Sequence, residues 1–286
     1  MAEVATFAMS DQLLVVIDPV ARRLDGESVR IAKDVLSAGA ATKVCLPDDP
    51  DEFARALTRR GSRRPVVVGD DRALTRAVTL LHRQRELAEC VLSVVPVGGA
   101  LSLAGSLGVP TGAVAAARAV LDGVERRLDL LVDDSDGVVL GGLRIPPIRD
   151  PAAPDGATAV GSGAGRPWLQ TCQSLVRTLV PARGDSPAAS GPSRLRVEVD
   201  GATLVDLDQP VEAVSVSPGV DGVAEVEVRP LSVGAEASPL LAVGRTVTVS
   251  GAHFRYRADT EVSGPVRTRT WVVREGAWGL TVPGAG

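Results

Sequence analysis

Apolar residues in the first half of the chain occur in short runs separated by segments with helical spacing. The runs at 13–17, 42–46, 65–68 and 91–95 are typical of buried strands. The segments at 28–38, 50–60, 71–85 and 111–122 place apolar residues three and four positions apart, and a small-residue helix is expected to end at Leu107. Alternating strands and helices predict an open α/β sheet, and such sheets bind ligands at the carboxyl ends of their strands.

From Arg194 onward the apolar period changes from 3.6 to 2. Alternating segments follow at 195–199, 213–216, 224–228, 246–249, 254–261, 266–273 and 278–282, and Asp200-Gly201 is a hairpin signal. The sequence predicts an α/β domain over residues 1–133 and a β-sandwich domain over 134–286, and the final strand is a candidate to return to the first domain. Residues 150–167 predict a disordered insert, 168–180 a helix and 181–193 a loose stretch.

Two loops of the first domain carry a family resemblance. The turn Gly69-Asp70-Asp71-Arg72-Ala73 follows a Val-rich strand, where diacylglycerol kinases and related lipid kinases have Gly-Gly-Asp-Gly-Thr. The run from Pro96 to Pro110 matches the family's second signature in length without a gap. It keeps Pro96, Gly98, Ala104, Leu107, Gly108 and Pro110, and departs at Gly99, Ala100, Leu101 and Ser102. The chain therefore resembles the catalytic domain of the diacylglycerol kinases.

That resemblance implies an α/β nucleotide-type domain, similar to phosphofructokinase and NAD kinase, followed by an antiparallel β-sandwich domain. It implies ATP-dependent phosphorylation of a lipid hydroxyl, with diacylglycerol as a candidate substrate, and it implies Mg²⁺. The residues that it assigns to the cofactor are Asp18, Gly69, Asp70, Arg72, Ala73, Pro96, Gly98 and Gly99. Asp221, in an Asp-Gly turn before a strand, is the candidate metal ligand.

The candidate catalytic residues are Asp71, Asp259 and Glu261. Asp259-Thr260-Glu261 resembles the family's Asp-Gly-Glu motif, and on a strand a spacing of two directs both carboxylates to one face. Glu261 would act as the general base and Asp259 as a metal or positioning group. The alternative for this pair is a solvated sheet edge. The alternative for Asp71 is an N-cap of the helix that follows it.

The departures from the family pattern favour a weak nucleotide site. Glycine permits positive φ and a close approach of phosphate, so Asp70 and Arg72 are expected to cost about 1 kcal/mol each in strain. Gly99 and Leu101 stand where the family has Thr and Asn, and each lost hydrogen bond is worth roughly 0.5–1.5 kcal/mol. The net charge of the turn is unchanged, so repulsion of phosphate does not by itself exclude ATP.

Composition and charge limit the ligands and the cellular location that are expected for this protein. The 286 residues carry a formal net charge of −4, which argues against a dedicated nucleic-acid binder. The three cysteines form no metal or disulfide pattern, which is typical of a cytoplasmic protein. No apolar run approaches the roughly 20 residues of a membrane helix, so a lipid substrate would be met at the membrane surface by a peripheral protein. A homodimer is a candidate assembly.

Three functions remain open at this point. The first is an active but weak lipid kinase, which the acidic motif at Asp259 and Glu261 favours. The second is a catalytically inactive pseudokinase that binds a nucleotide or a lipid, which the altered turn at 69–73 favours. The third is an NAD kinase, which shares the Gly-Gly-Asp-Gly-Thr turn, although the gapless match from Pro96 to Pro110 points to the lipid kinases.

Overall fold

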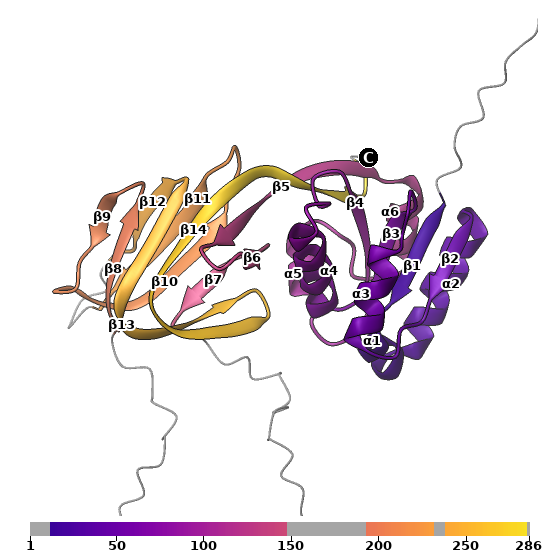
Figure 1. Ribbon diagram of the computed structural model, residues 1–286, viewed down its shortest axis with the longest axis horizontal. Helices are drawn as coiled ribbons and strands as arrows, with labels where there is room; N and C mark the ends of the chain where they lie inside the picture. Colours follow the sequence, from indigo (N-terminus) through magenta and orange to yellow (C-terminus); the bar gives the residue numbers. More distant parts are fainter. Residues whose placement is uncertain (1–11, 148–192, 232–237, 285–286) are drawn as a thin grey trace, which may run out of the picture.

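The computed structural model describes residues 12–147, 193–231 and 238–284. The predicted insert at 150–167, helix at 168–180 and stretch at 181–193 lie outside the described residues, except for Ser193. Figure 1 shows an α/β half, drawn in indigo and purple, beside a β half that is mostly orange and yellow. The predicted fold class is confirmed, because an α/β region is followed by a largely β region.

Four parallel strands form the centre of the α/β half. They are β1 (Leu13–Ile17), β2 (Thr42–Cys45), β3 (Arg64–Gly69) and β4 (Val91–Pro96), in the spatial order β4-β3-β1-β2. Nearly every residue of β1, β3 and β4 is buried, as expected for parallel strands that have helices on both faces. Gly69 and Pro96 lie opposite each other at the carboxyl ends of β3 and β4, so the loops that follow these strands are neighbours.

Six helices accompany this sheet, and most begin at an aspartate. They are α1 (Pro19–Leu24), α2 (Gly26–Gly39), α3 (Pro50–Thr58), α4 (Asp71–Arg83), α5 (Ser102–Ser106) and α6 (Ala113–Asp122). The carboxylates of Asp18, Asp25, Asp49 and Asp70 each accept a backbone N–H bond in the first turn of the helix that follows. Asp18-Pro19 starts α1, because it combines a capping aspartate with a proline in the first position.

Ten further strands build the β half and connect it to the first. They are β5 (Val124–Asp133), β6 (Val138–Val139), β7 (Leu143–Ile145), β8 (Ser193–Val199), β9 (Ala202–Val205), β10 (Pro210–Pro218), β11 (Ala224–Pro230), β12 (Leu240–Gly244), β13 (Thr246–Ala258) and β14 (Glu261–Val282). Pairing runs from β10 through β7, β13 and β8 back to β10, so the strands curl around a buried core. Strands β7, β9 and β12 were not among the predicted strands. Two pairs of predicted short strands are single strands, β13 and β14.

Strand β14 belongs to both halves. Its first part pairs with β13, and its last part pairs with β5 and, in parallel, with β4, where Gly279 and Leu280 lie opposite Val91 and Leu92. Trp271 is buried in the core of the β half and Trp278 in the core of the α/β half. The division at residue 133 stays a prediction. No helix in the described part of the chain is long and apolar enough to cross a membrane.

Candidate functional site

The turn after β3 is built differently from the sequence-based expectation. Asp70 has a φ of −84° and caps α4, where its carboxylate accepts the Ala73 N–H at 3.1 Å. Arg72 lies inside α4 and is therefore helical. The expected backbone strain at Asp70 and Arg72 is wrong, because neither residue occupies a conformation that only glycine favours. Gly69 is required for a different reason, since a Cβ there would lie 2.6 Å from the Cβ of Ala73 and 3.0 Å from that of Asp18.

Asp71 joins the turn to the second loop. Its side chain is buried, and its two carboxylate oxygens accept the N–H groups of Leu103 and Ala104 at 2.9 and 3.1 Å. The Ser102 hydroxyl donates a third bond at 3.2 Å, and the Asp71 N–H donates to the Ala100 carbonyl at 2.8 Å. The expected alternative role of Asp71, an N-cap of the following helix, is wrong because Asp70 takes that position. Asp71 instead holds the first turn of α5, more than 30 residues away.

Asp18 is a second buried carboxylate at this edge of the sheet, beside the half-buried Asp70. It accepts the Val20 N–H at 2.7 Å and forms an ion pair with Arg76 of α4 at 2.9 Å. Burial raises the pKa of the Asp70 carboxyl, and the nearby Asp18 charge raises it further against the opposing Ala73 N–H bond. Both oxygens of Asp18 and of Asp71, and one oxygen of Asp70, are therefore engaged by the chain itself.

The second loop contributes little free space beside these carboxylates. Pro96 is buried, and Gly98 has a φ of +125°, which favours glycine. A Cβ on Gly98 would lie 3.3 Å from the Cβ of Asp70, so the two loops approach closely there. Gly99 is exposed and has nothing near it.

Asp259 does not lie on a strand beside Glu261, so the expectation that both carboxylates point to one face of a strand is wrong. Asp259 has a φ of +46° and stands in the turn between β13 and β14. Its carboxylate accepts the N–H groups of Leu140, Gly141 and Gly142 at 2.7–3.1 Å. Burial raises the pKa of Asp259, the three amide bonds oppose this, and the Asp71 charge adds to it. Glu261 begins β14 and is exposed.

A cleft of about 580 Å³ lies between α4 and the β half. Its α4 side consists of Thr75, Arg76, Thr79, Leu80 and Arg83. The β side comes from the β5–β6 turn and from the β13–β14 hairpin, and its residues include Asp133, Tyr256, Glu261, Ser263 and Arg269. Of the predicted site residues, Glu261 lines this cleft and Asp71 does not.

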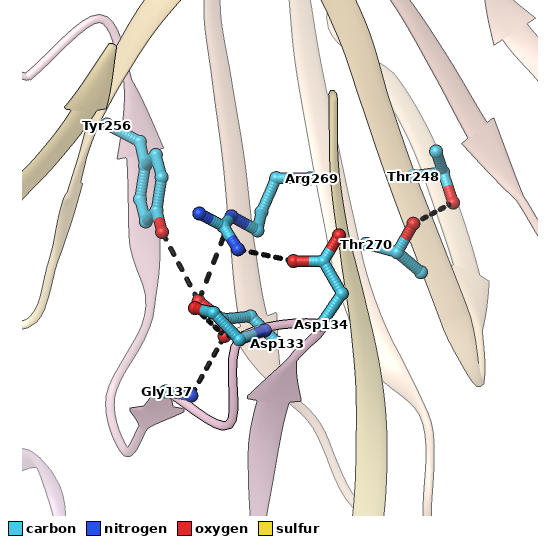
Figure 2. A network of polar contacts seen from close by, with 8 residues as sticks. Asp133, Asp134, Gly137, Thr248, Tyr256, Arg269 and Thr270 are labelled. Atoms are coloured by element: carbon cyan, nitrogen blue, oxygen red, sulfur yellow. Dashed lines mark hydrogen bonds and ion pairs between the residues drawn. The ribbon is translucent and has the colours of Figure 1, made fainter. Parts of the chain in front are cut away.

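A polar network supports the β side of the cleft (Figure 2). Asp133 accepts the N–H groups of Ser135 and Gly137, both at 2.8 Å, and the Tyr256 hydroxyl at 3.3 Å. Arg269 donates to Asp134 and lies 3.9 Å from Asp133. Burial raises the pKa of Asp133, but the bonds from Ser135 and Gly137 and the charge of Arg269 outweigh it and lower the pKa overall. Asp133 is therefore held as a carboxylate.

Sequence reasoning missed most of this cleft. Asp133, Tyr256 and Arg269 belong to no family signature. Arg76 stands where the first signature has Glu, so its pairing with the distant Asp18 was not indicated. The available signal for α4 was its amphipathic period, which separates a polar stripe from the buried face. Asp133 is the last residue of β5, at the buried end of the strand, and a charged residue in that position is a signal of a possible site.

Asp221 lies on an exposed turn with a φ of +58°. Among the described residues, no three His, Cys, Asp or Glu side chains are arranged to hold a metal ion. The neighbouring Gly222 N–H is bonded to Asp129 at 2.9 Å, which gives this turn a structural connection to β5. A metal role of Asp221 stays a prediction.

Comparison with solved structures identifies the architecture. Three structures of diacylglycerol kinases from Bacillus anthracis str. Sterne, two of them described as putative, superpose on the chain with TM-scores of 0.69, 0.70 and 0.67. The matches cover 96% of this chain and 97–98% of those chains. The chain has the diacylglycerol kinase fold. Sequence identity is only 11–12%, so the likeness is one of fold, and neither a family model nor a curated protein matches the sequence.

The residues of the diacylglycerol kinase signatures do not fit ATP and Mg²⁺ in this chain. Both carboxylate oxygens of Asp71 are engaged by α5, and both oxygens of Asp259 are engaged by backbone amides. A carboxylate can ligate a metal only with oxygens that remain accessible, and Asp71 is 1% exposed. The Asp18 carboxylate is likewise engaged, by the Val20 N–H and by Arg76.

Proposed function

We propose that this protein is a catalytically inactive relative of the lipid kinases that uses the diacylglycerol kinase fold as a binding module. One observation carries the proposal: the Asp71 carboxylate, which matches the acid of the first family signature, is buried and bonded to the first turn of α5. A carboxylate bonded in this way is not available to ligate Mg²⁺, and the Leu103 and Ala104 N–H groups that it occupies are not available to phosphate. The arrangement of Asp18 and Asp70 supports the same conclusion.

A second candidate is a weak ATP-dependent kinase that acts on a lipid hydroxyl. The observation that favours it is Glu261, which lies exposed in the cleft and has no hydrogen-bond or ion-pair partner within the described residues. A carboxylate with free oxygens is suited to accept a proton from a hydroxyl group. This candidate needs a bound nucleotide, and the phosphate-binding turn argues against that.

The test measures ATP binding and phosphoryl transfer on the same protein sample. We expect calorimetry to detect no saturable binding of ATP with MgCl₂, and we expect no transfer of labelled phosphate to diacylglycerol in mixed micelles. A cooperative thermal unfolding transition in that sample shows that the protein is folded. Saturable ATP binding, together with transfer that Glu261→Gln abolishes, would overturn the proposal and establish the second candidate.

A further inference from the structure

The cleft between α4 and the β half carries a polar stripe that the proposed function does not explain. Thr75, Thr79 and Arg83 are four residues apart in α4, so they follow one another along a single face of the helix. Together with Arg76 and Leu80, they form the α4 side of a cleft of about 580 Å³. This volume is within the range of roughly 300–1,000 Å³ that is typical of small-molecule sites.

Most charges in the cleft are neutralised within the protein. Arg76 is paired with the buried Asp18 at 2.9 Å, and Arg269 is held by Asp134 and Asp133. These five paired side chains therefore stabilise the fold and offer little uncompensated charge to a ligand.

Two charged side chains in the cleft are left without a partner. Among the described residues, the side chains of Arg83 and Glu261 have no hydrogen-bond or ion-pair partner, and they do not pair with each other. Arg83 comes from α4 and Glu261 from the β13–β14 hairpin, so a free cation and a free anion face one cavity from opposite walls. The neighbouring His82 is bonded to Asp136 at 2.9 Å, outside this pair.

We propose that the cleft binds a small phosphate monoester that carries a free hydroxyl group. Arg83 holds the phosphate, and Glu261 accepts a hydrogen bond from the hydroxyl. This assignment rests on the proposed function, in which the cleft binds its ligand and does not phosphorylate it. The phosphate monoester can belong to a soluble metabolite or to a lipid headgroup, because the recognised chemistry is the same.

The donors in the cleft favour phosphate over carboxylate. Arg83 offers a guanidinium, and the Thr79 and Ser263 hydroxyls line the same cavity. A phosphate monoester presents three strong acceptor oxygens, whereas a carboxylate presents two. The lining combines these polar groups with apolar side chains that include Leu80 and Val138.

The first experiment compares ligands on the full chain by calorimetry. The soluble probes are glycerol 3-phosphate, inorganic phosphate, glycerol and glycerate. The lipid probe is a phosphatidylcholine vesicle containing phosphatidylinositol 4-phosphate, with pure phosphatidylcholine vesicles as the control. We expect binding of glycerol 3-phosphate, of the phosphoinositide vesicles or of both, and the pattern identifies the source. Inorganic phosphate and glycerate should bind at least tenfold more weakly than the better of these two probes.

The second experiment changes the two unpaired residues. A hydrogen bond to a charged group contributes about 1.5–3 kcal/mol, so Arg83→Gln should weaken binding of the phosphate monoester roughly 10- to 100-fold. The matched control is Arg118→Gln, which removes an exposed arginine from α6 and should leave binding unchanged. Glu261→Gln should reduce the preference for glycerol 3-phosphate over inorganic phosphate, because an amide oxygen accepts a hydrogen bond more weakly than a carboxylate and because the substitution removes a charge that repels phosphate.

The outcomes separate this inference from the proposed function. Absence of binding by both phosphate monoester probes overturns the inference and leaves the absence of ATP binding untouched. Equal effects of Arg83→Gln and Arg118→Gln, or equal affinity for glycerate and glycerol 3-phosphate, also overturn it. Conversely, detection of kinase activity overturns the proposed function. The effect of Arg83→Gln on phosphate monoester affinity is a separate measurement, and it still decides whether Arg83 holds the phosphate.

Discussion

Restoring two glycines to the turn after β3 tests whether its side chains or its packing exclude nucleotide. The double substitution Asp70→Gly and Arg72→Gly reproduces two positions of the diacylglycerol kinase signature without changing the net charge. The sequence alone predicts a gain of affinity from relieved strain. The structure predicts no gain, because Asp70 has a φ of −84° and Arg72 is helical.

The expected cost of this change follows from the two positions in α4. Replacing a capping aspartate by glycine costs only a few tenths of a kcal/mol, because glycine is itself tolerated at the cap. Glycine within a helix costs about 1 kcal/mol relative to the best helix formers. Together, the two substitutions should lower the free energy of unfolding by about 1–1.5 kcal/mol. ATP affinity should not change, because Asp71 and α5 keep their contacts.

Urea unfolding and calorimetry with ATP and MgCl₂ measure the two quantities on one preparation. Arg118→Gly is the matched control for stability, since it places a glycine at an exposed arginine position within α6. It should cost about 1 kcal/mol, by the same propensity difference. A gain in ATP affinity of tenfold or more in the double variant, without loss of stability, would refute the geometric argument and restore the strain explanation.

The remaining predictions concern buried polar groups. Asp71→Ala removes the acceptor of two backbone N–H groups and should cost about 2–4 kcal/mol in urea unfolding, with Asp71→Asn intermediate because one acceptor oxygen remains. Arg76→Ala leaves the Asp18 carboxylate buried without its cation and should cost about 2 kcal/mol, reduced from the full value for a buried pair because Arg76 is partly exposed. The pKa of Asp133 is lowered in the folded state, so its carboxylate adds stability above the usual pKa of 3.8 that is lost as the pH falls through the folded-state pKa. The difference in unfolding free energy between the parent and Asp133→Asn should therefore shrink on acidification. Gly69→Ala forces a Cβ to within 2.6 Å of another and should cost about 1–3 kcal/mol.

Local patterns in the sequence predict the elements of this fold well. Strand β1 has the predicted bounds, and α2, α3 and α4 differ from their predictions by a few residues at their ends. Apolar periodicity is a local property that burial imposes on each element, so it can be read without knowing the neighbours. The short strands β7 and β12 were not predicted because three to five residues are too few to display a period.

The roles of the acidic residues could not be predicted in the same way. Asp71 and its amide partners are more than 30 residues apart, and Asp259 is bonded to backbone groups more than 115 residues earlier in the chain. Arg76 meets Asp18 across 58 positions. Each of these contacts exists only after the elements have packed, so spacing within a motif carries no information about them. Motif matching gave the correct fold and an incorrect chemical environment for the same residues.

Carboxylates and phosphates compete for the same backbone N–H groups. This competition explains how a fold can keep some of its motif residues without binding phosphate. Free N–H groups at helix starts and in tight loops attract any anion, whether it is a ligand or a side chain. In this chain the anions are its own side chains, since Asp70 caps α4, Asp71 holds α5 and Asp259 holds residues 140–142. An internal carboxylate carries no cost of association, so a nucleotide must displace a partner that is already in position. The unpaired charges of Arg83 and Glu261 lie instead in the cleft beside α4, and binding there requires no such displacement.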